Sequence, residues 1–195
     1  CGIHKPLNNK YSDKLLLSKN KPNELHNNCS GKHLGMISGC MGKEIEIGDY
    51  TKMNHPFQKL IRSSLEYFTE NKIYKIQKGI DGCSAPQYAF SLKNLSIAMI
   101  NLLKNFHESK LFSEEVKTLL KAIAKYPELT GGKNIYPSQL IRATGGKMFS
   151  KGGAEGVLLF AHKEKKIGGI IKVTDGNERA IPSVANKIFK KLEIL

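Results

Sequence analysis

The stretch that decides the fold class is Val157–His162 (VLLFAH), followed after the connection KEKK by Ile167–Thr174 (IGGIIKVT). Both runs are short and rich in β-branched and aromatic residues, a composition typical of strands. Two such runs joined by a short polar connection are typical of a β-hairpin. The sequence therefore predicts a pair of antiparallel strands in the last quarter of the chain.

Helical patterns precede and follow this hairpin. Apolar residues recur with helical spacing after Pro56, which suits a first helical turn because proline lacks the amide hydrogen that this position leaves unpaired. Four further helices are predicted at 92–106, 113–124, 138–143 and 185–192. Helices followed by a hairpin and a last helix predict a mixed α/β (α+β) fold, which we expect to form a single domain over residues 1–195.

The chain carries a large positive charge, formally +14 at pH 7. Such an excess can indicate a nucleic-acid partner or an anionic membrane surface. Only Arg62, Arg142 and Arg179 are arginines, however, and the lysines are spread along the whole chain. Arginine is preferred for bidentate contacts to phosphates and bases, so the lysine excess is more typical of codon bias. We expect no nucleic-acid partner, and keep nucleic-acid binding as the weaker alternative.

The sequence also bears on location. No apolar run approaches the roughly 20 residues of a membrane-spanning helix, so no membrane partner is expected. The opening Cys1–Pro6 does not resemble a secretory signal, and we interpret it as a chain entered midway. Cysteines in such a chain are expected to be reduced, and cytosolic cysteines are more often metal ligands or catalytic groups than disulfide partners. A cytoplasmic location is therefore predicted.

The first chemical motif is Cys29-Ser30-Gly31-Lys32-His33, which places a thiol, an amine and an imidazole within one turn. An apolar pattern after it predicts a helix that starts at Gly31, with Ser30 as the N-cap. The positive end of a helix lowers the pKa of a nearby thiol and favours an anion.

A second motif, Asp81-Gly82-Cys83-Ser84-Ala85-Pro86, follows an alternating run at 74–78 that predicts a strand. Cys29 and Cys83 lie too far apart for a local zinc pattern, and two buried small thiols are the alternative interpretation. Both cysteines nevertheless lie in glycine-containing turns beside polar residues. His33 and Asp81 are candidates for binding a polar substrate, the alternatives being a capping residue and a turn former.

A third motif, Ser150–Val157, contains Lys151 followed by two glycines. It is similar to the Lys-Thr-Gly element of hydrolases that pair a Ser-x-x-Lys motif with a second lysine on an edge strand. A serine nucleophile needs a base within hydrogen-bond reach. The one Ser-x-x-Lys match, Ser18–Lys21, lies in a polar loop and is interpreted as chance. No nucleophile is therefore identified in this chain.

Taken in order, residues 29–36, 79–86 and 153–157 resemble the signature blocks of the rhizobial-type L-asparaginases, and Cys1–Pro6 is similar to a block that precedes them. These enzymes are zinc-binding serine-lysine hydrolases whose fold is related to that of β-lactamases and penicillin-binding proteins. The resemblance covers nearly the whole chain and implies a part of that fold.

The resemblance implies a role for each candidate residue. Zinc would be held by Cys29, Lys32 and Cys83, and the asparagine pocket would be lined by His33 and Asp81, with Asp81 pairing with the substrate α-amine. Lys151 would be the second catalytic lysine. The implied reaction is hydrolysis of L-asparagine to L-aspartate and ammonia through an acyl-enzyme.

The resemblance also implies that the nucleophilic Ser-x-x-Lys motif lies upstream of Cys1, so that this chain is the C-terminal portion of the enzyme and inactive alone. A homodimer is the oligomeric state that it suggests. The alternative is a non-catalytic module that binds zinc and asparagine and lacks the nucleophile.

Overall fold

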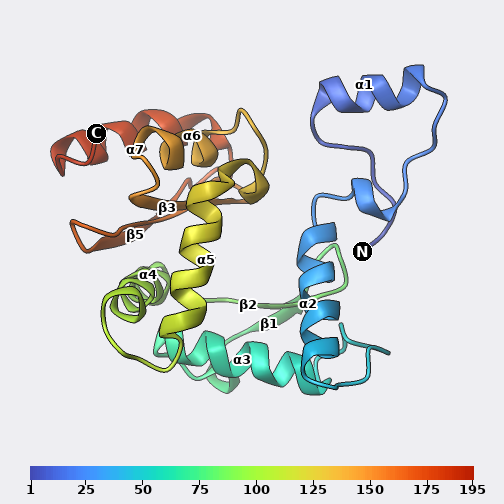
Figure 1. The fold of residues 1–195 in the computed structure, drawn as a ribbon, viewed down its shortest axis with the longest axis horizontal. Coiled ribbons are helices and arrows are strands. Elements are labelled where there is room, and N and C mark those ends of the chain that lie inside the picture. Colours follow the sequence, from blue (N-terminus) through green and yellow to red (C-terminus); the bar gives the residue numbers. More distant parts are fainter. The chain divides into compact units, whose positions relative to one another are not determined.

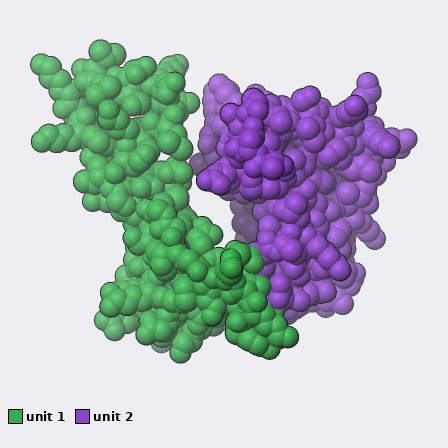
Figure 2. Space-filling model, turned by 180° about the vertical axis from the view of Figure 1, so that it is seen from behind, with its two compact units in different colours: residues 1–65, 72–89 green, residues 66–71, 90–195 purple.

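The computed structural model describes residues 1–195, which form two compact units. Unit 1 consists of residues 1–65 and 72–89, and unit 2 of residues 66–71 and 90–195 (Figure 2). Helices and antiparallel strands occur together, which confirms the mixed α/β fold class. The single domain and the relation to β-lactamases stay predictions.

Unit 1 is mainly helical (Figure 1). Its helices are α1 (Asn9–Leu17), α2 (Ser30–Gly42) and most of α3 (Pro56–Thr69), the last of which begins at the predicted proline. The short strands β1 (Lys78–Ile80) and β2 (Pro86–Tyr88) pair antiparallel, with Ile80 opposite Pro86. Single 3-10 turns occupy Glu24–His26 and Ile73–Lys75. The predicted strand at 74–78 is therefore wrong in position, because the strand starts only at Lys78.

Helix α2 begins one residue earlier than the sequence indicates. Cys29 is the N-cap and Ser30 is the first helical residue, so the assignment of Ser30 as N-cap is wrong. The reason lies in Asn27, whose Oδ1 accepts the Cys29 amide at 2.8 Å. This local turn directs the chain into the helix before Ser30 is reached.

Unit 2 has a three-stranded antiparallel sheet in the order β3-β4-β5. Its strands are β3 (Met148–Gly153), β4 (Val157–His162) and β5 (Ile167–Lys172), and the β4–β5 pair confirms the predicted hairpin. Its helices are α4 (Leu92–His107), α5 (Ser113–Lys125), α6 (Tyr136–Ala143) and α7 (Ile181–Lys191), with 3-10 turns at Pro127–Thr130 and Glu178–Ala180. The sequence analysis did not predict β3.

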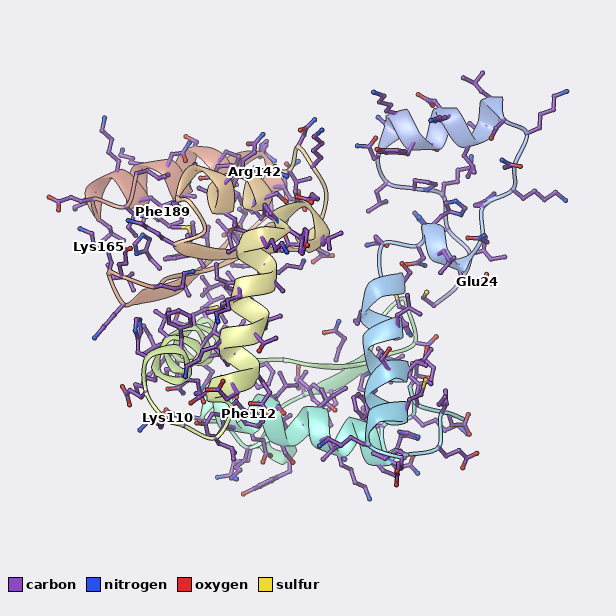
Figure 3. The ribbon with its side chains drawn as sticks, viewed as in Figure 1. Glu24, Lys110, Phe112, Arg142, Lys165 and Phe189 are labelled. Carbon is purple, nitrogen blue, oxygen red and sulfur yellow. The ribbon has the colours of Figure 1, made fainter.

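Helices cover both faces of this sheet (Figure 1). On one face α6 and α7 pack against an apolar cluster made of Leu140, Met148, Leu158, Phe160, Ile181, Ala185 and Phe189. Phe189 of α7 points toward the sheet (Figure 3), and its ring lies edge-on to Phe160 with centroids 4.9 Å apart. On the other face α4 and α5 supply Leu102, Leu103, Val116 and Leu120, which pack with Ala161. No helix of the chain has the length and apolar content needed to cross a bilayer.

The C-terminal end of α3 is held by asparagines of α4. Asn94 Nδ2 donates to the Thr69 carbonyl at 3.0 Å, and Asn101 Nδ2 donates to the Phe68 carbonyl at 2.9 Å. Asn101 also reaches a Glu70 carboxylate oxygen at 2.9 Å. The last carbonyls of a helix have no hydrogen-bond donor within the helix. The two asparagine side chains supply donors to these carbonyls.

We expect Asn101→Ala to lower the free energy of unfolding by about 2 kcal/mol, because it removes the side-chain donor of the part-buried Phe68 carbonyl. Asn101 is 7% exposed. Urea unfolding followed by circular dichroism measures the effect. Asn134→Ala, at an exposed asparagine, is the control and should change stability by less than about 0.5 kcal/mol. Equal effects of the two substitutions would contradict this role.

Candidate functional site

The first two chemical motifs of the sequence meet in unit 1. Lys32, in the first turn of α2, donates to Asp81 Oδ2 at 2.5 Å. Asp81 opens the turn that joins β1 to β2. The contact brings together side chains that are far apart in the sequence.

The Asp81 carboxylate is fixed by its own turn. Oδ1 accepts the amide hydrogens of Cys83 at 2.8 Å and Ala85 at 2.9 Å. Burial opposes the charge, but the hydrogen bonds from Lys32, Ala85 and Cys83 outweigh it and lower the pKa of Asp81 to about 2. Asp81 is therefore a fixed negative charge at neutral pH, with Oδ1 fully engaged in the turn.

Lys32 is the more open partner of this ion pair. Its side chain is 41% exposed, against 14% for that of Asp81. Burial tends to discharge the amine, but the hydrogen bond and charge of Asp81 and the nearby Cys29 and Cys83 raise the pKa of Lys32 above its usual value. Lys32 is thus an ammonium group beside two thiols.

The two thiols lie against each other. Cys29 and Cys83 are both half-buried and free of disulfide bonds. The hydrogen bond with Cys29 and then burial raise the pKa of the Cys83 thiol. The positive charge of Lys32 opposes this shift, because it favours the thiolate form of Cys83.

His33 is the most deeply buried of the candidate side chains, at 3% exposure. Its Nδ1 lies 2.7 Å from the Tyr50 hydroxyl oxygen, whereas Nε2 has no hydrogen-bond partner. Burial lowers the pKa of His33, although the Cys83 backbone partly favours the protonated ring. A neutral imidazole with one unsatisfied nitrogen thus lies beside the Cys83 turn.

Two thiols and an amine are donor types that a thiophilic divalent cation would accept. Nowhere in the chain are three His, Cys, Asp or Glu side chains placed to hold a metal ion. A metal held at the thiol pair would have Lys32, which lies near Cys29 and Cys83, as the candidate third ligand. Two sulfur atoms and a nitrogen are ligands that zinc accepts, and three protein ligands leave one position open. Lys32 must lose its proton to bind, which a nearby cation favours.

The remaining candidates lie elsewhere. Lys151 is in unit 2, on the edge strand β3, and its Nζ donates to the Gly152 carbonyl at 2.5 Å. The Ser18 hydroxyl of the chance motif donates to the Leu15 carbonyl at 2.9 Å and accepts from Asn20 at 3.1 Å. Neither partner of Ser18 is a base.

The sequence analysis missed Tyr50. It lies in a polar loop between α2 and α3, where no periodic pattern marks it. Gln87 was also missed, and its Nε2 lies 3.4 Å from Asp81 Oδ2. Only the fold relates these side chains to the two motifs.

Comparison with known proteins adds one finding. The sequence model of the family described as L-asparaginase II matches residues 1–195. No curated protein matches the chain. The family match thus spans the thiol and carboxylate site of unit 1 and the Lys151 strand of unit 2.

Proposed function

We propose that this chain, which belongs to the L-asparaginase II family, acts in the hydrolysis of L-asparagine to L-aspartate and ammonia, with an auxiliary zinc site. The observation that carries the proposal is the Lys32–Asp81 pair beside the thiols of Cys29 and Cys83. It joins two motifs that resemble rhizobial-type asparaginases into one polar site.

In this proposal Cys29, Lys32 and Cys83 hold the metal. A zinc ion held there would supply a Lewis acid for orienting a polar substrate. Lys32 cannot serve at once as a charged partner of Asp81 and as a neutral metal ligand. As an ammonium group, Lys32 balances the charge of the Asp81 carboxylate. As a neutral metal ligand it would leave that negative charge available to a substrate.

Asp81 and His33 bind the amino acid. Asp81 is ionised at neutral pH, and its Oδ2 is the oxygen that faces Lys32, so an α-ammonium group is the natural replacement for the lysine. His33 presents a buried nitrogen without a partner, which suits an oxygen of the same ligand. The two side chains thus match opposite charges of an amino acid.

The chemical step requires a serine and two lysines, of which we assign Lys151 as the second lysine. The serine oxygen attacks the side-chain amide carbon, and the amide nitrogen takes up a proton and leaves as ammonia. Water then cleaves the ester to give aspartate and restores the serine. We expect this serine in a Ser-x-x-Lys motif upstream of Cys1, and expect the isolated piece to be about 10⁶-fold slower without it.

A second candidate is a module that binds zinc and asparagine without catalysis. The observation that favours it is Ser18, whose hydroxyl partners are a carbonyl and an amide and no base. The two candidates share the same site in unit 1 and differ only in the nucleophile.

Ammonia release from L-asparagine by the full-length native gene product tests the proposal. We expect release by that product and none by residues 1–195 alone. Asparagine binding without ammonia release would favour the non-catalytic module, and the absence of both would contradict the proposal. The intact mass of the same sample tests the expected upstream segment, and its native mass tests the homodimer.

A further inference from the structure

His33 has an unusual set of contacts for a buried side chain. It is 3% exposed, with Nδ1 paired to the Tyr50 hydroxyl at 2.7 Å and Nε2 unpaired. A buried polar atom without a partner costs free energy of folding, so its presence calls for an explanation such as a bound ligand or a functional role. The resemblance to rhizobial-type asparaginases implies that His33 binds substrate, but it does not say which residue orients the imidazole ring.

Tyr50 is itself held in place from α3. Gln58 Nε2 donates to the Tyr50 backbone carbonyl at 2.9 Å and lies 3.2 Å from the Met36 sulfur. Gln58 is 2% exposed, and its hydrogen bond to Tyr50 is partly buried. The Tyr50 and His33 rings meet edge-on, with centroids 5.7 Å apart. A chain of contacts therefore runs from Gln58 of α3 through Tyr50 to the imidazole.

The hydrogen bond at Nδ1 determines what Nε2 can do. In a neutral imidazole one nitrogen donates and the other accepts, and the partner of one nitrogen decides the state of the other. The phenol hydroxyl is an effective donor, so a bond from Tyr50 to Nδ1 leaves the proton on Nε2.

We propose that Tyr50 is a positioning residue that holds His33 with Nε2–H as a buried donor for an oxygen atom of the ligand. The oxygen is a carboxylate or carboxamide oxygen of an amino acid, an identity that rests on the proposed function. Tyr50 acts through His33 and touches no reacting atom. Its hydroxyl is thus part of substrate recognition although it lies in a loop outside the sequence motifs.

The direct test is the tautomer of His33 in the full-length protein, read from ¹⁵N–¹H nuclear magnetic resonance spectra of its imidazole. His33→Gln identifies the signal by its loss. The wild type should show the Nε2–H form, and Tyr50→Phe, which keeps the ring and removes the hydroxyl, should lose this preference. A wild-type spectrum with the proton on Nδ1 would overturn the proposal without need of any variant.

Kinetics give a second readout. Tyr50→Phe should raise KM for L-asparagine about tenfold, the scale of one hydrogen bond to a charged group. Its kcat should stay within about twofold and its zinc content should not change, because Tyr50 is neither a ligand nor a reacting group. Tyr74→Phe, at a tyrosine that is 71% exposed, is the control and should change neither the tautomer nor KM.

The outcomes separate this inference from the proposed function. A wild type that hydrolyses asparagine, with a Tyr50→Phe variant that keeps both tautomer and KM, overturns the role of Tyr50 alone. A wild type that neither binds nor hydrolyses asparagine overturns the proposed function. The tautomer of the wild type and of Tyr50→Phe then still decides whether Tyr50 orients His33.

Discussion

Cys29→Ala should remove the zinc ion from the full-length protein. The wild type is expected to contain about one zinc per chain at this site, held by three protein ligands. Loss of a side chain that only supports a ligand costs 10–100-fold in metal affinity, so loss of a thiolate ligand should cost at least about 100-fold. Metal analysis after dialysis measures the change. Cys83→Ala should behave in the same way, since the two thiols contact each other.

The other two cysteines provide matched controls. Cys40 is completely buried on α2, and Cys1 is half-buried and lies 3.7 Å from the Glu24 carbonyl. Neither belongs to the thiol pair, so Cys40→Ala and Cys1→Ala should retain zinc. If Cys29→Ala retains it as well, the cysteines are only packing groups and the metal site is wrong.

Asp81→Asn should raise KM for L-asparagine about 100-fold, because it removes the negative charge that is expected to bind the α-ammonium group. In this variant the carboxamide side chain at position 81 keeps an oxygen that can accept the amide hydrogens of Cys83 and Ala85, so the turn should persist. Steady-state kinetics at neutral pH, where the wild-type carboxyl group is ionised, measure the change.

Asp49→Asn is the control for this substitution. Asp49 also pairs with a lysine, Lys52, at 2.7 Å, but both side chains are mostly exposed. Exposed pairs contribute little, so KM and stability should be nearly unchanged. A KM of Asp81→Asn that equals the wild-type value would remove Asp81 from the substrate site.

The sequence predicted those parts of the fold whose pattern is carried by hydrophobic residues. The hairpin at β4 and β5 and the helix that begins at Pro56 are of this kind. Strand β3 was missed because one of its two fully buried positions is Ser150. A polar residue at a core position breaks the alternation on which strand prediction depends.

Helix α1 was missed for a different reason. None of its residues is buried, so it has no core-facing apolar stripe, and the sequence analysis predicted no helix there. Asn8 caps the helix through its side chain, which accepts the Tyr11 amide at 3.4 Å. Local capping of this kind stabilises a helix without a hydrophobic pattern.

The site was predictable in its residue types and less so in its contacts. The motifs around Cys29 and Cys83 predicted that two thiols, an amine and a carboxylate belong to the site. Their mutual contacts depend on how the β1–β2 turn packs against α2, which spacing alone cannot specify. Tyr50 shows the limit most clearly, because its role depends on one hydroxyl contact made from an irregular loop.

Zinc-edge X-ray absorption spectroscopy of the native full-length protein tests the central claim most directly, because it reports the atoms bound to the metal. The account predicts two sulfur ligands at about 2.3 Å and nitrogen or oxygen ligands at about 2.0–2.2 Å. This pattern corresponds to Cys29, Cys83 and Lys32 with one open or solvent position. A spectrum without sulfur ligands, or one with four, would contradict the site.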